Sequence, residues 1–136
     1  MNYWMTISTR RFCGSRTPSA VCTRRPCSPR PTTAIAVAGT PTSLSAIDLE
    51  LEPYDSERVH GHVLSLPTIQ RLLSKLASVP LEQRKEIDGM HPDRAPTIVA
   101  GVVILIETMR AFGLDEVEAS EHDILYGTAL STLERD

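Results

Sequence analysis

The chain has 136 residues, of which 41% are hydrophobic and 23% are charged, and its formal net charge at neutral pH is −3. This composition is typical of one modest soluble globular domain and excludes a protein with several large cores. The longest apolar run, Ile98 to Ile106, is far shorter than the roughly 20 residues that cross a bilayer, so we expect no membrane segment.

The charge is distributed unevenly along the chain. Residues 1–33 contain six arginines and no Asp, Glu or Lys, whereas residues 34–136 contain eight basic and seventeen acidic residues, a net charge of −9. Residues 1–33 also contain four prolines and show no period of 2 or 3.6 residues, so we expect this Arg/Ser/Pro/Cys-rich segment to be disordered or non-native.

Three explanations of this basic segment stay open. It is a flexible arm that contacts an anionic partner, an Arg-rich transit peptide, or an out-of-frame translation joined to a genuine coding segment. The abrupt change of composition fits the third explanation best. The segment has neither interleaved aromatic platforms nor a recognition-helix pattern, so its arginines alone do not favour nucleic acid as a partner.

All three cysteines lie in the same segment, at positions 13, 22 and 27. Their spacing matches no common zinc pattern, and no histidine precedes His60, so we expect no metal site there. An odd number of thiols argues against a disulfide framework, and the amino-terminal residues lack the apolar core of a secretory signal. We therefore expect a cytoplasmic protein.

The first predicted elements are a strand and a helix. Residues 34–38 form a short apolar run that indicates a buried strand, and Gly39-Thr40-Pro41 closes it with a turn. A helix is expected from about Pro41 to Leu49, because proline is tolerated in a first helical turn. A polar connector follows at about residues 53–61.

Two helices are predicted after the connector. The first is capped by Ser65 and ended by Pro80, and its apolar positions recur at i, i+3, i+4 and i+7: Ile69, Leu72, Leu73 and Leu76. A shorter helix is expected at residues 81–87, before a loop that contains Gly89 and Pro96.

The remaining chain predicts a long helix, a short strand and a last helix. The apolar run that begins at Ile98 continues to a C-terminal glycine, Gly113, which is too long for a typical strand. Residues 117–119 suit a short strand, and Ser120 with Asp123 has the spacing of a capping box that starts the last helix. The order β-α-α-α-β-α predicts a small α/β layer structure with parallel strands.

Three stretches resemble the motifs of a known family. Residues 37–47, Val-Ala-Gly-Thr-Pro-Thr-Ser-Leu-Ser-Ala-Ile, resemble its Ala-Gly-Thr-x-Thr-Thr-Leu-Ala-Ala loop, and residues 54–62 resemble its Tyr-Asp-x-x-x-Val-His-Gly segment. Residues 88–101, followed by Ser120-Glu121, resemble Gly-Leu-x-Pro-x-Arg-Ala-x-x-Ile-x-Ala-Gly and a closing Val-Ser-Glu. In this order and with these gaps, residues 34–136 resemble the C-terminal part of the exopolyphosphatase/guanosine pentaphosphatase (Ppx/GppA phosphatase) family.

The resemblance implies a fold and a set of site residues. The fold is expected to be a partial second lobe of the actin, Hsp70 and sugar-kinase type, which is ribonuclease H-like. Gly39, Thr40 and Thr42 then form the loop on the phosphate or nucleotide side, although a tight strand-to-helix turn explains Gly39-Thr40 equally well without the resemblance. Arg94 and Gly101 lie in the part that resembles the hinge between lobes, and we attribute Gly101 to close helix packing.

The family's function implies groups that these residues do not contain. Hydrolysis of a phosphoanhydride needs donors around the phosphoryl oxygens, usually a metal ion, and a carboxylate that positions water. In the family, Mg²⁺, a catalytic glutamate and two glycine-rich phosphate loops supply these, and the loops and glutamate precede the Gly39-Thr40 loop. No such motif occurs here, so no residue is predicted to be catalytic.

Two functional hypotheses follow from this pattern. The first is an enzyme fragment that, together with the missing N-terminal lobe, hydrolyses terminal phosphoanhydride bonds of inorganic polyphosphate or guanosine pentaphosphate. The second is a non-catalytic interaction module or a gene remnant without activity of its own. His60 and His62, two residues apart, suit one strand face, but a metal site needs a third ligand that the sequence does not indicate, so no metal site is predicted.

Overall fold

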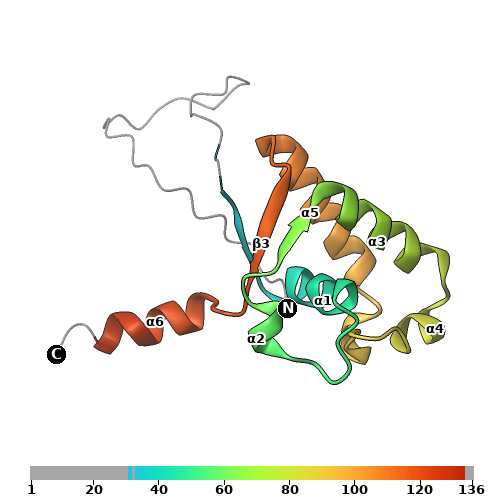
Figure 1. The fold of residues 1–136 in the computed structure, drawn as a ribbon, viewed down its shortest axis with the longest axis horizontal. Coiled ribbons are helices and arrows are strands. Elements are labelled where there is room, and N and C mark those ends of the chain that lie inside the picture. Colours follow the sequence, from blue (N-terminus) through green and yellow to red (C-terminus); the bar gives the residue numbers. More distant parts are fainter. Residues whose placement is uncertain (1–30, 32, 134–136) are drawn as a thin grey trace.

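The sheet has three short strands, with the last strand of the chain in the middle (Figure 1). The computed structural model describes residues 31 and 33–133. The strands lie in the order β1-β3-β2 and span Ile35–Val37, Glu116–Ser120 and Val63–Ser65, respectively. β1 runs parallel to β3, and β2 runs antiparallel to it, so that Glu118 lies between Ile35 and Val63.

Helices α1 (Gly39–Asp48), α3 (Leu66–Ser78) and α5 (Ile98–Phe112) cover one face of this sheet (Figure 1). The shorter elements lie around them: α2 (Ser56–Val59), α4 (Leu81–Lys85) and the 3₁₀ turn η1 (Pro92–Arg94). The last helix, α6 (Ile124–Leu133), leaves the end of β3 and extends away from the other helices (Figure 1).

The core lies between the sheet and the three long helices. One buried side chain from each strand enters it: Ala36, Leu64 and Val117. α1 contributes Leu44 and Ile47, and the facing sides of α3 and α5 contribute a larger apolar set: Ile69, Leu72, Leu76, Val102, Leu105 and Met109. Burial of this continuous apolar layer is the main favourable term that holds the two layers together.

The α/β class and the individual helices agree with the sequence-based expectations. Ser65 caps α3, because its Oγ accepts a hydrogen bond of 3.3 Å from the Thr68 N–H. The apolar run at 98–106 is helical and ends at Gly113, whose φ of 65° is the left-handed conformation that favours glycine. The expected short helix after Pro80 is present as α4.

Several details differ from the expectations. The one-turn helix α2 lies within the expected polar connector, and β2 follows directly after it, where no strand was expected. Because β2 is antiparallel to β3, the sheet is mixed rather than parallel. The expected capping box at Ser120 is wrong, because Ser120 ends β3. Asp123 starts α6 instead, and its Oδ1 accepts hydrogen bonds from the N–H groups of Leu125 at 2.9 Å and Tyr126 at 3.2 Å.

Arg84 of α4 connects the end of α3 to the loop before α5. Its guanidinium donates three hydrogen bonds to backbone carbonyls, to Leu76 at 2.8 Å and to Val79 and Ala95 at 3.1 Å each. Carbonyls at a helix C-terminus have no partner within the helix, so Arg84 supplies both a donor and a favourable positive charge. This side chain fixes the segment that leads to η1.

The cysteine positions and the disorder expected for the basic segment fall on residues 1–30 and 32, which lie outside the described residues. Within residues 31 and 33–133, we find no helix with both the length and the apolar character needed to cross a membrane.

Candidate functional site

The candidate site lies at the edge of the sheet where the parallel strands β1 and β3 end. Val37 and Ser120, the last residues of these strands, are paired, so the turns that follow them leave the sheet side by side. The segment before β2 reaches the same edge, because β2 is antiparallel and begins there. In open α/β sheets, ligands bind outside the carboxyl ends of the strands, which makes this edge the first place to search.

α1 begins directly after the turn at the end of β1. Ala38 joins the two elements with a φ of 79° and a ψ of 179°, which L-residues rarely adopt. No side chain caps the helix, and the Thr42 hydroxyl instead donates a hydrogen bond of 3.2 Å back to the Ala38 carbonyl. The first N–H groups of a helix have no intrahelical partner, so this turn presents backbone donors and the positive end of the helix dipole.

The four sequence-predicted residues Gly39, Thr40, Arg94 and Gly101 come together in two pairs. A Cβ atom on Gly39 would lie 2.4 Å from Arg94 Cζ, so the guanidinium lies directly over this glycine. A Cβ atom on Gly101 would lie 2.4 Å from Thr40 Oγ1, so α5 approaches the first turn of α1 closely. η1 and α5 therefore enclose the start of α1, and Arg94 adds a positive charge there.

Tyr54 and Glu121 connect the ends of two distant segments beside this turn. The Tyr54 hydroxyl donates a hydrogen bond to the Glu121 carboxylate, and it also contacts the Thr42 side chain. Burial, then the hydrogen bond to Glu121 and its negative charge, raise the pKa of Tyr54 to about 12, while the bond to Thr42 opposes the shift. The phenol therefore stays protonated near neutral pH and acts as a donor.

His60 approaches Glu121 from its backbone side. Its Nδ1 accepts a hydrogen bond of 3.3 Å from the Glu121 N–H. The His60 ring lies 4.3 Å from the His122 ring, centroid to centroid, and His122 stacks on Tyr126 at 4.0 Å with an interplanar angle of 6°. These contacts join the segment after α2 to the end of β3 and the start of α6.

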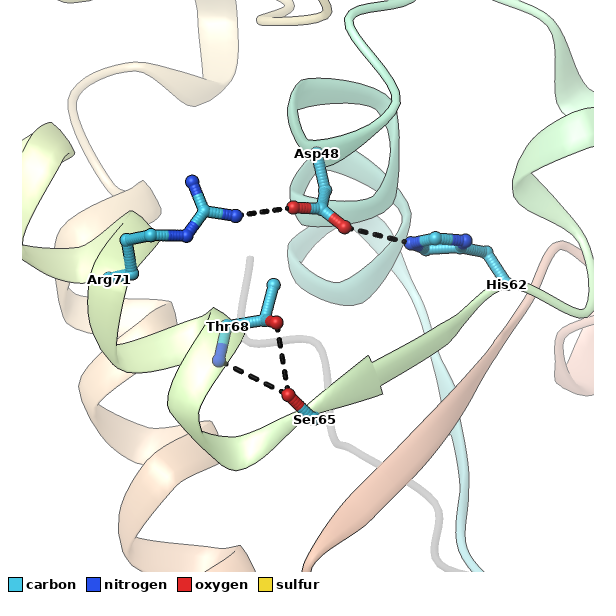
Figure 2. A network of polar contacts seen from close by, with 5 residues as sticks. All are labelled: Asp48, His62, Ser65, Thr68 and Arg71. Atoms are coloured by element: carbon cyan, nitrogen blue, oxygen red, sulfur yellow. Dashed lines mark hydrogen bonds and ion pairs between the residues drawn. The ribbon is translucent and has the colours of Figure 1, made fainter.

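His62 makes a different contact and does not join His60. Its Nε2 lies 3.2 Å from Asp48 Oδ2, and Arg71 donates a hydrogen bond of 2.7 Å to Asp48 Oδ1 (Figure 2). This network joins the end of α1 to β2 and α3. In the described part of the chain, no three His, Cys, Asp or Glu side chains come together as a possible metal site.

The hydrogen bond between Tyr54 and Glu121 and the ring contacts of His122 with His60 and Tyr126 were not predicted from the sequence. Tyr54, His60 and Glu121 belong to the quoted motifs, but Tyr54 and Glu121 are separated by 67 positions. No local pattern connects residues so far apart. Only the structure brings them together, because residues 54–62 precede β2, which was not predicted, and Glu121 follows β3.

Three comparisons with known proteins agree. A family model described as the Ppx/GppA phosphatase family matches residues 26–135. Exopolyphosphatase 2 of Mycobacterium tuberculosis is 34% identical over 101 residues, which are 71% of this chain and 32% of that protein. A bifunctional 3-dehydroquinate synthase/phosphatase of Fusobacterium nucleatum is 36% identical over 100 residues, which are 74% of this chain and 15% of that protein.

The fold is also similar to solved structures. The crystal structure of the Aquifex aeolicus member of the Ppx/GppA family superimposes with a TM-score of 0.72 at 29% sequence identity, and the match covers 76% of this chain and 34% of that chain. The chain thus spans about a third of the length of these exopolyphosphatase and structural relatives.

Proposed function

The chain belongs to the Ppx/GppA phosphatase family, and on that basis we propose that it forms the part of an exopolyphosphatase that holds the phosphates of the substrate. Its α/β fold is that of the actin, Hsp70 and sugar-kinase type lobes found in the family. The proposed reaction is hydrolysis of the terminal phosphoanhydride bond of inorganic polyphosphate.

The observation that carries this proposal is the arrangement at the start of α1. Gly39 lies beneath the Arg94 guanidinium, and no side chain makes a capping hydrogen bond at the start of the helix. A helix N-terminus and an adjacent guanidinium are both favourable partners of phosphate oxygens. Residues 34–136 carry a net charge of −9, so a polyanion needs such a local positive field to approach this part of the chain.

Each residue at the edge receives a distinct role. The backbone N–H groups of Gly39 and Thr40 donate to phosphate oxygens, and Thr42 holds the turn through its bond to Ala38. The bond between Tyr54 and Glu121 keeps the carboxylate oriented toward the phenol. We expect this orientation to reduce repulsion between Glu121 and a bound phosphate.

The chemical step requires groups that the described residues do not bring together. The family resemblance assigns the catalytic glutamate and the glycine-rich loops to residues that precede the Gly39-Thr40 loop in the family, and we propose that these groups and the N-terminal lobe are needed for hydrolysis. The described residues do not fit a metal site of three or more acidic, His or Cys ligands, so we assign no Mg²⁺ ligand within them. On this proposal the purified chain with magnesium releases no phosphate from long-chain polyphosphate.

Binding of inorganic tripolyphosphate tests the proposed site directly. Amide NMR spectra of the chain are recorded during titration, and we expect the largest shifts at Gly39, Thr40 and Thr42. Gly39→Ala forces the Arg94 guanidinium aside and should weaken binding about tenfold, as loss of one good charge-assisted contact does. Gly127→Ala is the matched control, because a methyl group there meets no atom within 4 Å.

Two outcomes would contradict the proposal. NMR shifts centred on another surface, or an unchanged affinity of Gly39→Ala for tripolyphosphate, would show that the start of α1 does not bind phosphate.

Guanosine pentaphosphate, measured in the same titration, tests which substrate is preferred. Binding much tighter than that of tripolyphosphate would show that the nucleotide is preferred to the inorganic chain.

A further inference from the structure

Two exposed imidazoles, which we call the histidine pair, lie at the carboxyl end of β3. His60 directly follows α2, and His122 follows β3 by two residues. Their ring centroids are 4.3 Å apart, and both residues are exposed. The charge of histidine ordinarily changes between about pH 5 and 8. The histidine pair therefore adds positive charge to this edge of the sheet only when it binds protons.

The histidine pair lies close to the proposed phosphate-binding turn. Val37 and Ser120 are paired at the ends of β1 and β3, and neighbouring strands lie about 4.8 Å apart. The Tyr54 hydroxyl contacts side chains that follow both strands, because it donates to Glu121 and also lies against Thr42. One phosphate chain that begins at the N–H groups of α1 can therefore extend to the residues after β3.

The contact between His60 and Glu121 requires a neutral imidazole. The Glu121 N–H donates a hydrogen bond of 3.3 Å to His60 Nδ1, so this nitrogen carries no proton. When the ring takes a proton from solvent, Nδ1 becomes a donor that faces a second donor. An anionic oxygen placed between the two N–H groups accepts from both of them, and it replaces the hydrogen bond that protonation breaks.

The segments that meet at the histidine pair are otherwise acidic. Their charged groups come from α2 and its cap, from β3 and its turn, and from the start of α6: Asp55, Glu57, Arg58, Glu118, Glu121 and Asp123. Tyr126 also faces the pair, because it stacks on His122. Five carboxylates and one guanidinium give a net negative charge, so an anion is repelled from this place while the imidazoles are neutral.

We propose that His60 and the Glu121 N–H form a second phosphate subsite, which binds an oxygen of linear polyphosphate when His60 is protonated, with His122 as an additional positive charge. The inference rests on the proposed function, because it extends a chain bound at the start of α1 to the end of β3. Phosphate then favours the charged imidazole, and the charged imidazole favours phosphate to the same extent. Polyphosphate therefore binds more tightly in mildly acidic solution.

Titration of the full chain with size-fractionated linear polyphosphate at several pH values tests the subsite. His60→Gln keeps an oxygen that accepts the Glu121 N–H, but its amide does not take up a proton in this range. The ligand also binds protons, and its own titration affects the parent and the variant equally. The ratio of their two dissociation constants therefore isolates the contribution of His60.

The expected ratio depends on pH. His60→Gln should bind about tenfold more weakly than the parent near pH 5.5, as expected for the loss of one charge-assisted contact, and about equally near pH 8. His122→Gln should weaken binding over the same pH range by about threefold, because this imidazole contributes charge without the shared contact.

Two further measurements distinguish the subsite from a structural role of His60. His62→Gln removes an imidazole that lies against Asp48, and the glutamine amide can still donate to this carboxylate. This control should keep the pH dependence of the parent within about twofold. Calorimetry in two buffers of different ionisation enthalpy counts the protons taken up on binding, and the parent should take up more protons than His60→Gln.

Amide NMR spectra recorded in the same titration locate the ligand. Shifts at Gly39, Thr40 and Glu121, with a pH-dependent affinity that is lost in His60→Gln, are the expected result. Equal pH dependence of the parent and His60→Gln, with shifts at Gly39 and Thr40, would overturn the subsite and leave the proposed function intact. Loss of the pH dependence in His62→Gln as well would also overturn the subsite. Absence of shifts at Gly39 and Thr40 in the parent would overturn the proposed function and this inference with it.

Discussion

Substitution of Gly101 by alanine is expected to destabilise the protein, although alanine is the better helix former. In an open helix interior the change gains about 1 kcal/mol. Here the new Cβ would lie 2.4 Å from Thr40 Oγ1 and 3.2 Å from its Cγ2, and overpacking of this kind costs about 1–3 kcal/mol. Thr40 lies in the first turn of α1, so relief of the clash must also displace the proposed phosphate-binding turn. The free energy of unfolding of Gly101→Ala is therefore expected to be lower than that of the parent by about 1 kcal/mol.

Urea unfolding followed by circular dichroism measures this loss, and a double-mutant cycle identifies its cause. Thr40→Ala removes both atoms that obstruct the new Cβ, so Thr40→Ala/Gly101→Ala should recover about 1–2 kcal/mol relative to the sum of the single changes. Gly127→Ala adds its methyl group in open space and should not lower the free energy of unfolding. A Gly101→Ala protein as stable as the parent, or a cycle without coupling, would refute the close approach of α5 to α1.

Three further predictions concern polar contacts. Arg84→Ala removes three hydrogen bonds to carbonyls and should cost about 2–3 kcal/mol in urea unfolding, and Arg84→Lys should restore little because an ammonium cannot reproduce the planar geometry. The pKa of Tyr54 is raised from 10.0 to about 12 in the folded state, so its contribution to the free energy of unfolding is complete below pH 10 and is lost as the pH rises to 12. A Tyr54→Phe protein should lack this loss, and ultraviolet titration of the phenols checks the pKa. Arg71→Ala should change stability by less than about 1 kcal/mol, and less in high salt, because the Arg71 side chain is 64% exposed.

The helices α3 and α5 were predictable because each is encoded by its own neighbouring residues. In α3 the Ser65 cap directly precedes a helix of thirteen residues that contains the whole apolar period. In α5 the length of the apolar run and the C-terminal Gly113 distinguish a helix from a buried strand. β2 has only three residues and runs directly into α3, so it has no room for the alternation that signals a strand.

The arrangement of the candidate site was predictable only in part. The Gly39-Thr40 turn follows from its place between a strand and a helix, but the contact of Gly39 with Arg94 depends on how η1 packs on α1. Ser120 was wrong as a cap, because the hydroxyl spacing alone cannot show that β3 continues through this residue. Asp123, the residue directly before α6, accepts the hydrogen bond from the Leu125 N–H that caps the start of this helix.

The central position of β3 has a consequence for the order in which the protein folds. β1 and β2 do not pair with each other, and both wait for β3, which is close to the end of the described chain. During synthesis the helices α1, α3 and α5 are complete before any hydrogen bond between the three described strands can form. Pairing of Ile35 with Glu118 closes a long loop, and such distant contacts slow folding. Within the described residues, the two early strands thus have no pairing partner until residue 120 has been synthesised, and unpaired strand edges favour aggregation and chaperone binding.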